Sequence, residues 1–505
     1  MTPETFFENF GLIAEAPNGI KKLREMILQL AVQGKLVPQD PKDEPANELL
    51  KKIKAEKDSL IKDGKIKKEK LHPLIRTEDM PYVLPHSWEW TKLGNLTYIR
   101  TGKLDANASN PNGIYPFFTC AKDPLRIDHY SYNCECVLLA GNGNFDVNYY
   151  HGKFEAYQRT YIIEPINRIL LRIPFLYRYI QNYSKVLRDM SIGGVISYIK
   201  IGFLTEALFP LPPLNEQHRI VEKVDQLMAL CDELEEKQAR RSKTRTSLTV
   251  ASFQALAEAK EKDEFRRAWE RVRDGFGFLT ETPESIKELQ QTILQLAVKG
   301  WFTGKCFPSI PETKISDFIY FQNGYAFKSN DFSKKGVRLL RNINIGHGNI
   351  IWEITECIPF QEAKKYESFR LKKNNIVLSL DRPIIQGGLK IARVSDTNLP
   401  SLLLQRVARV FIKNDDLLMD YFYLWLQSSA FISNIDPGRS KGVPHISTKQ
   451  IKAIPFYCPS KDEQKVTIDK TNKLIALCHD IDQSLKDSEY FSSKLTTAMT
   501  TTLIQ

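Results

Sequence analysis

Residues 27–32 read Ile-Leu-Gln-Leu-Ala-Val, and residues 293–298 repeat the same six residues in the same order. The match extends upstream to 20–21 and 286–287, which are both Ile-Lys. Within each copy the apolar residues recur at steps of three and four, which predicts an amphipathic helix. We call this helix element A, and its two copies predict an internally repeated chain.

A second repeated segment, element B, reads Pro-Pro-Leu-Asn-Glu-Gln at 212–217 and Pro-Ser-Lys-Asp-Glu-Gln at 459–464. Each copy continues into apolar residues that alternate steps of four and three, which is typical of the seam along which helices pair. We expect the two B helices to pack as an antiparallel coiled coil; the alternative is that each helix packs into the core of its own domain. The seam residues are Ile220, Val224, Leu227, Cys231, Leu234, Leu474, Cys478, Ile481 and Leu485.

The elements follow the order A, variable segment, B, and then the same three again. Short apolar runs at 137–140, 161–163, 376–380 and 407–412 predict strands, and aromatic-rich runs at 175–180 and 420–426 predict helices. We therefore expect an α/β (α+β) fold with two similar domains, joined by long helices and related by a pseudo-twofold repeat. The predicted segments are a helical region with a charged linker (1–80), the first variable domain (81–211), a central helical region (212–302), the second variable domain (303–458) and a C-terminal helical region (459–505).

The composition narrows the class of protein. The 505 residues carry a formal net charge of +11, and 42% of them are hydrophobic. A basic balance favours nucleic acid or an anionic membrane surface as a partner, but no apolar run approaches the ~20 residues of a membrane span. The eight cysteines are scattered through a long chain, which indicates reduced thiols. We expect a cytoplasmic protein with no membrane partner.

No catalytic constellation is evident in the chain. Residues 300–306 have the wrong spacing for a phosphate-binding loop, and there is no Asn-Pro-Pro-Tyr run of the kind an amino-methyltransferase uses. The close cysteine pair at 134 and 136 lacks the spacing of a zinc site. The sequence therefore predicts neither a catalytic residue nor a metal site.

Polar residues beside turn glycines are the candidates for contact with DNA. Arg, Lys, Asn and Gln on loops can present donors and acceptors to base edges in the major groove. Any one of them could instead be an ordinary solvated side chain; the two basic domains together favour DNA. The candidates are Arg100, Lys103, Asn142, Asn144, Arg159, Lys328, Arg341, Asn342, Arg382, Gln386, Lys390, Arg406, Arg439 and Lys441.

With these motifs the chain resembles the specificity subunit of type I restriction-modification enzymes. The resemblance lies in residues 212–221 and their second copy from Pro459, in residues 27–38, and in Pro-His-Ser-Trp-Glu-Trp at 85–90. It implies that the variable domains are target-recognition domains, each reading one half of a bipartite, asymmetric double-stranded DNA target. The second copy of element B departs from the first at 460–462, which weakens the symmetry only.

The resemblance also implies partners. Two methyltransferase (modification) subunits and two restriction (motor-nuclease) subunits would dock on the chain. S-adenosylmethionine, ATP and Mg would belong to those partners, and this chain would bind no cofactor. Two alternatives remain open: a helical scaffold whose variable domains bind ligands other than DNA, and a DNA methyltransferase or nuclease with an unrecognised site.

Overall fold

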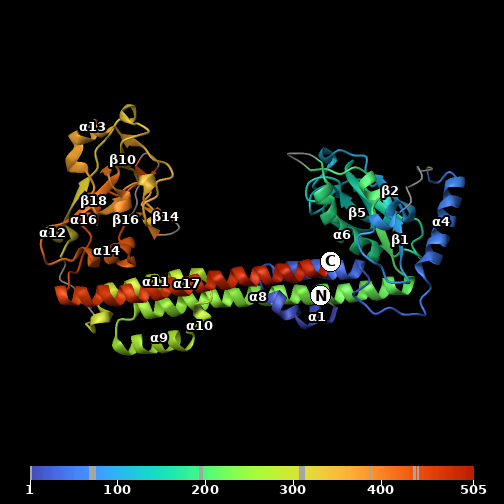
Figure 1. The fold of residues 1–505 in the computed structure, drawn as a ribbon, viewed down its shortest axis with the longest axis horizontal. Coiled ribbons are helices and arrows are strands. Elements are labelled where there is room, and N and C mark those ends of the chain that lie inside the picture. The colour runs from blue at the N-terminus through green and yellow to red at the C-terminus, as the bar shows by residue number, and fades with distance from the viewer. Residues whose placement is uncertain are drawn as a thin grey trace. The chain divides into compact units, whose positions relative to one another are not determined.

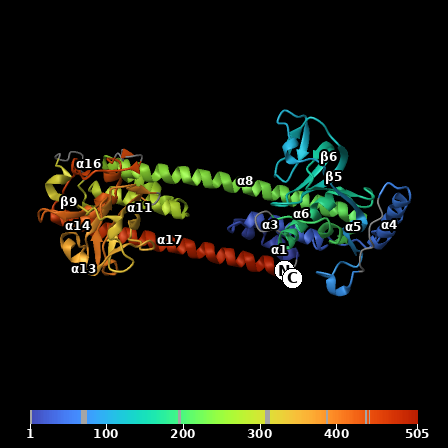
Figure 2. The same ribbon diagram turned by 90° about the horizontal axis from the view of Figure 1, so that it is seen from above.

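The chain folds into two units, residues 1–240 with 488–505 and residues 241–487. Each unit joins a helical bundle to a domain built on β-sheets, as the computed structural model shows (Figure 1, Figure 2). Helices α8 (Leu214–Glu258) and α17 (Lys461–Ile504) each belong partly to one unit and partly to the other. The predicted fold class, two α/β domains joined by long helices, is confirmed. The structure describes residues 3–66, 75–192, 197–305, 313–385, 388–435, 439–440 and 443–504.

In the first unit, element A is helix α3 (Gly19–Val32), and it covers the first seam. Four of the five seam residues of α8 are buried in one core with the apolar face of α3, and Leu234 is partly buried against it. Met499, near the end of α17, packs against the same core, and Lys22 of α3 donates a hydrogen bond to Thr497 at 2.9 Å. The first seam therefore pairs with element A.

The second unit repeats this arrangement. Element A is helix α11 (Pro283–Val298), and Cys478 of the second seam is buried in a core with its Ile286 and Ile293. Leu474, Ile481 and Leu485 are packed against that core, which also contains Phe253 at the end of α8. The described residues of each seam thus lie in the core of their own unit, which is the alternative to pairing of the two B helices with each other. The reason is that element A offers an apolar face of matching length.

The repeat reaches further upstream than the sequence motifs do. Helices α1 (Pro3–Glu8) and α2 (Phe10–Glu15) precede α3, as α9 (Lys262–Asp274) and α10 (Phe276–Leu279) precede α11. Phe6 and Ile13 are buried in the first core, and Val272 and Leu279 occupy the same offsets before element A in the second. The buried positions themselves differ in residue type, but Phe-Gly recurs at 10–11 and 276–277 at the same offset, so both the sequence and the burial support the relation.

The first variable domain is built on a six-stranded sheet with strand order β2-β7-β5-β6-β3-β4. Helix α6 (Ile173–Met190) packs on it, and β1 (Glu89–Lys92) pairs with β8 (Leu208–Leu211) where the chain enters and leaves the domain. A helical arm, α4 (Ala46–Lys62), contacts the short helix α5 (Leu93–Leu96). The remaining elements are β2 (Thr97–Thr101), β3 (Tyr115–Phe118), β4 (Leu125–Ile127), β5 (Tyr132–Ala140), β6 (Val147–Ala156), β7 (Thr160–Pro165) and α7 (Gly202–Thr205).

The second variable domain keeps the central strands and splits one of the others. Strands β9-β18-β13-β16 pair in the same order as β2-β7-β5-β6. In the first domain β6 also pairs with β3, whereas in the second domain a separate strand, β17, pairs with β10. Its elements are α12 (Ile315–Phe318), β9 (Ile319–Asn323), β10 (Val337–Leu340), β11 (His347–Gly348), β12 (Cys357–Ile358), α13 (Phe360–Ala363), β13 (Ile376–Ser379), β14 (Ile384–Ile385), β15 (Gly388–Leu389), β16 (Ile391–Arg393), β17 (Ser401–Leu403), β18 (Val407–Ile412), α14 (Met419–Gln427), α15 (Ser429–Ile432), β19 (Arg439–Ser440), β20 (Val443–Pro444) and α16 (Thr448–Lys452).

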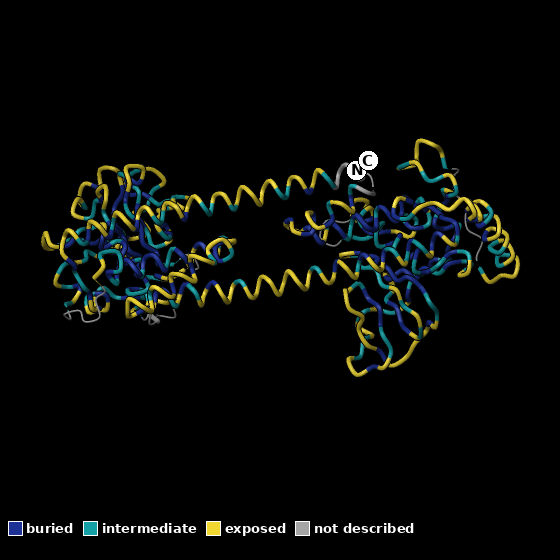
Figure 3. Tube along the Cα trace, turned by 90° about the horizontal axis from the view of Figure 1, so that it is seen from below, coloured by how far each residue is buried: buried dark blue, intermediate teal, exposed yellow. Residues whose placement is uncertain are grey.

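Buried and exposed residues are separated in a similar way in the two units. The central strands of the sheets are largely buried, whereas a long stretch of α8, residues 235–248, is mostly exposed (Figure 3). Among the described residues, no helix combines the length and the apolarity needed to cross a membrane.

A buried glutamine at the start of each B helix ties the bundle to the variable domain. Gln217 accepts a hydrogen bond from the backbone N–H of Arg172 at 2.9 Å and donates to the carbonyl oxygens of Leu170 and Pro212. Gln464 makes the same three contacts in the second unit, with the backbone of Leu418, Asp416 and Pro459. Both side chains are fully buried. Each glutamine therefore satisfies the backbone of the turn that precedes α6 or α14.

We expect Gln217→Ala and Gln464→Ala each to lower the free energy of unfolding by at least about 2 kcal/mol, because buried polar groups lose their partners at about 1–3 kcal/mol each. Urea denaturation measures this loss. Gln483→Ala, at an exposed position of α17, is the matched control and should cost under about 0.5 kcal/mol. Equal effects of all three substitutions would contradict this stabilising role of the two buried glutamines.

The glutamates before these glutamines have opposite environments. Glu216 is fully buried and accepts hydrogen bonds from Trp88 at 2.9 Å and Gln39 at 2.6 Å; its burial raises the pKa. Glu463 lies 2.7 Å from the ammonium of Lys305, which lowers the pKa of that carboxyl to about 2. A lowered carboxyl pKa stabilises the fold above the unfolded pKa, and that stability is lost as the pH falls toward the folded pKa.

We therefore expect Glu463→Gln to lower the urea midpoint at pH 7, and the difference from the parent chain to shrink as the pH falls from about 4.5 toward 2. Urea titrations at pH 7 and pH 3.5 measure it. Asp462→Asn removes a neighbouring exposed carboxylate and should show no such trend. A difference for Glu463→Gln that is the same at both pH values would refute the ion pair as its cause.

Candidate nucleic-acid interface

Both variable domains build one edge from the same backbone hydrogen bonds. Gly141 donates its N–H to the carbonyl oxygen of Arg159 at 2.8 Å, and Leu380 donates to that of Arg406 at 2.8 Å. These bonds join the end of the central strand, β5 or β13, to the turn that precedes its neighbouring strand, β7 or β18. A Gln-Arg pair stands at this turn in each domain, Gln158-Arg159 in the first and Gln405-Arg406 in the second, and the two pairs are therefore structurally equivalent.

A third segment joins each edge by matching bonds. Gly143 donates its N–H to the carbonyl oxygen of Ser197 at 3.0 Å, and Arg382 donates to that of Pro444 at 2.8 Å. We call this feature the shared edge. It comprises residues 101–104, 141–144, 157–160 and 197–199 in the first variable domain, and residues 323–325, 380–382, 404–407 and 444–446 in the second.

Glycine is required where the first segment meets the turn. A Cβ on Gly102 would lie 2.0 Å from the carbonyl oxygen of Ala156, and one on Gly324 would lie 2.2 Å from that of Leu404. Such distances admit no side chain, so Gly102 and Gly324 allow the two segments to pack against each other. Their role is backbone packing.

Two arginines of the second edge adopt a strained backbone. Arg382 has φ +45° and Arg406 has φ +70°, in the left-handed region that favours glycine. The first domain places Gly143, with φ +74°, at the position of Arg382. A non-glycine residue held there costs about 1–2 kcal/mol, and such strain clusters at functional sites.

The side chains on the first shared edge are polar and accessible. Lys103, Asn144 and Arg159 are exposed, and Asn142 is half-buried where it bridges to Tyr198. A guanidinium and side-chain amides offer directed donors and acceptors, which suit the edge of a nucleic-acid base.

The second shared edge presents a charged cluster at the equivalent positions. His445 Nδ1 lies 2.6 Å from the carboxylate of Asp381, and the Arg406 guanidinium lies 3.6 Å from the same oxygen. Arg406 and Arg382 are exposed. Asp381 and His445 replace Asn142 and Tyr198, so the two edges share a backbone and differ in chemistry.

Several predicted residues lie away from the shared edges. Arg341 donates to the carbonyl oxygen of Ile354, Asn342 lies in a short helix, and Lys328 is exposed on a separate loop. Lys390 lies beside Arg382 of the second edge but is buried, and burial followed by the charge of Arg382 lowers its pKa. Arg439 lies in β19; Gln386 and Lys441 fall outside the described residues.

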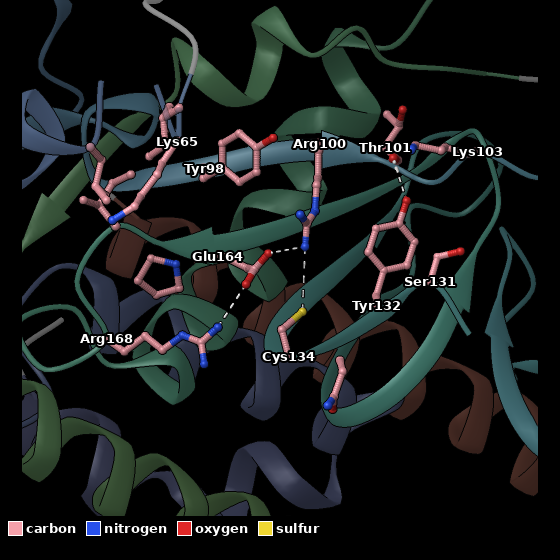
Figure 4. A pocket seen from close by; sticks show the side chains of 15 residues that line it. Lys65, Tyr98, Arg100, Thr101, Lys103, Ser131, Tyr132, Cys134, Glu164 and Arg168 are labelled. Carbon is pink, nitrogen blue, oxygen red and sulfur yellow. Dashed lines mark hydrogen bonds and ion pairs between the residues drawn. The ribbon is translucent and has the colours of Figure 1, made fainter. Parts of the chain in front are cut away.

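Arg100 lies in a hollow beside the first shared edge (Figure 4). Its guanidinium makes an ion pair with Glu164 at 2.6 Å and lies over the rings of Tyr98 and Tyr132. Glu164 also pairs with Arg168 at 3.0 Å. Arg100 is therefore held by its own domain, unlike the free Arg159.

Asp381, His445 and Tyr198 were not expected from the sequence. Their residue types are not those that most often contact base edges, and no sequence motif surrounds them. The Gln-Arg match marks the equivalent turns, and the Gly-Val pairs at 194–195 and 442–443 precede the third segment, but neither match points to the side chains that differ. In the part of the chain that is described, no three His, Cys, Asp or Glu side chains gather as a metal site.

We expect Arg382→Gly to raise the free energy of unfolding by about 1 kcal/mol relative to Arg382→Ala, because glycine relieves the left-handed strain. Both variants lack the guanidinium, so their difference isolates the backbone. Thermal or urea denaturation of the pair measures it. Equal stability of the two variants would show that no strain is stored at this position.

Comparison with known proteins agrees with this duplicated architecture. The family model described as "Type I restriction modification DNA specificity domain" matches residues 85–241 and 311–488. The chain is 35% identical to the type I restriction enzyme EcoAI specificity subunit of Escherichia coli, over 95% of this chain and 93% of that protein. The EcoEI specificity subunit of the same organism is 25% identical over 95% of this chain and 93% of its own length.

A solved structure resembles the fold as well. It comes from work on complex assembly and conformational transition of the type I R-M system. The match has a TM-score of 0.52 and 14% identity, and covers 84% of this chain and 99% of that one. At this identity the likeness concerns the fold alone.

Proposed function

Because the chain belongs to the family of type I restriction-modification specificity subunits, we propose that it supplies the DNA sequence specificity of such a complex. Each shared edge reads one half of a bipartite, asymmetric target. The observation that carries this proposal is the pair of edges with one backbone and different side chains: Asn142 against Asp381 and Tyr198 against His445. Two readers of different chemistry suit two different half-sites.

The reading residues of this proposal are the exposed and half-buried polar side chains of the edges. A guanidinium can donate two parallel hydrogen bonds to guanine, and an asparagine can pair with adenine in the same manner. We assign these roles to Lys103, Asn142, Asn144 and Arg159 in the first domain and to Arg382, Arg406 and His445 in the second. Lys390 is left out because it is buried.

The proposal includes the partners. The chain is non-catalytic and docks two modification subunits and two restriction subunits, to which S-adenosylmethionine, ATP and Mg belong. Residues 81–211 and 303–458 form the recognition domains. A cytoplasmic setting is consistent with the seven described cysteines, which form no disulfide among themselves.

The test is to co-express the chain with its modification subunit in a host that lacks adenine methylation and to map methylated adenines. We expect a bipartite motif that disappears when this chain is omitted. The same methylation without the chain, or a stable complex with no motif, would favour the scaffold alternative.

Exchange of one reader should change one half of that motif. We expect replacement of residues 90–206 by the corresponding segment of the EcoAI subunit to alter a single half-site, because the segment carries the whole first edge. A change in both halves would contradict the two-reader arrangement.

Single arginines should act on separate half-sites. Arg159→Ala and Arg406→Ala should each weaken binding of the assembled complex about 10- to 100-fold, since a bidentate base contact is worth about 1–3 kcal/mol. Each should relax specificity in its own half only, measured with half-site mutant duplexes. Arg266→Ala, on the exposed face of α9, serves as the control and should leave both halves unchanged.

A further inference from the structure

The hollow beside the first shared edge has a volume of about 720 Å³, and no sequence motif predicted it (Figure 4). Two parts of the chain form it: the segment that follows α4, with Lys65, and strands β2, β5 and β7 of the first variable domain. Strand β2 contributes Tyr98 and Arg100, β5 contributes Tyr132 and Cys134, and Arg168 follows β7. Residues distant in sequence thus converge on one open cavity.

The lining is strongly cationic. Four basic side chains line the hollow, Lys65, Arg100, Lys103 and Arg168, and Glu164 is the one carboxylate among the lining residues; Asp63 lies 3.5 Å from Lys65 outside the lining. Glu164 bridges both arginines, at 2.6 Å and 3.0 Å, and so fixes two guanidinia without neutralising the site. The Arg100 Nε is buried without a hydrogen-bond partner. An anion with several oxygens would offset this excess of positive charge.

The hollow adjoins the shared edge directly. Thr101 and Lys103 line it, and Gly102 between them donates its N–H to the carbonyl oxygen of Thr160 at 3.1 Å, next to Arg159. A ligand in the hollow would therefore lie beside whatever Arg159 contacts. In duplex DNA, phosphates lie beside the base edges in this way, and basic side chains that bind them fix the register of a protein.

We propose that this hollow is a phosphate clamp that holds a backbone phosphodiester of the DNA next to the half-site read by the first domain. This inference rests on the proposed function. Lys65 and Arg168 grip the phosphate, and Arg100, held by Glu164, braces the wall.

The clamp belongs to one half only. In the first unit, residues 33–88 separate element A from the first strand and supply α4 and Lys65. In the second unit, α11 ends at Val298 and α12 already begins at Ile315. The DNA is therefore gripped asymmetrically, with an added backbone contact at the first half-site.

The experiment measures affinity of the complex with its modification subunit for target and non-target duplexes across a range of salt. Each phosphate contact contributes about 0.9 to the slope of log K against log salt. We expect Lys65→Gln and Arg168→Gln each to reduce the slope by about 0.9, to weaken target and non-target binding by the same factor, and to leave the methylated motif unchanged. Lys54→Gln, at an exposed position of α4 itself, is the matched control and should leave the slope unaltered.

Other outcomes separate the rival explanations. Unchanged slopes, with a parent complex that still discriminates its target, overturn the clamp while leaving the proposed function intact. A parent complex that shows no target preference overturns the proposed function itself. The same variants are titrated with inorganic phosphate and ATP in the absence of DNA. Loss of that binding with unchanged slopes would assign the hollow to a free phosphate ligand and overturn the backbone version.

Discussion

The structure depends on one repeated contact, the buried glutamine at the start of each B helix. Gln217 and Gln464 are fully buried, and each makes three hydrogen bonds with backbone groups of the turn before α6 or α14 and of the turn before its own helix. An unsatisfied carbonyl or N–H there would cost more than most surface interactions return. The orientation of α6 or α14 relative to its B helix follows from this contact, and each variable domain is anchored to its bundle through it.

The anchored domains combine a constant backbone with variable side chains. Backbone hydrogen bonds and close glycine contacts build both shared edges, so neither depends on the residues that project from them. Asn142 and Asp381, or Tyr198 and His445, can therefore differ without a change of scaffold. The left-handed backbone at Arg382 shows how far this goes, because the scaffold holds an arginine where the other copy has glycine. Such separation of framework from reader allows specificity to change while assembly is retained.

The two halves are not equivalent in charge. The arm that carries α4 exists only before the first domain and adds a cationic wall beside its edge. The second edge instead carries its charges within a compact group of Asp381, Arg406 and His445. The two domains thus differ in the charge and chemistry of their edges, which suits the asymmetric target proposed for the chain.

The sequence by itself determined the repeat, the α/β class and some of the helices and central strands of each unit. Apolar spacing depends on local periodicity, so it located β18 at 407–412 and the helices of elements A and B. It also identified which residues of the B helices are apolar on one face. The Gln-Arg pairs marked equivalent turns, because a shared backbone there leaves a shared local sequence.

Only the tertiary structure decided what those faces and turns meet. Periodicity identifies a seam but not its partner, and element A covers each seam within its own unit because its apolar face lies within reach. Lys390 and Arg159 look alike in sequence, yet one is buried and the other exposed, since burial depends on strands that are remote along the chain. Asp381 meets His445, and Lys65 shares a hollow with Arg168, for the same reason: long-range contacts leave no local pattern in the sequence.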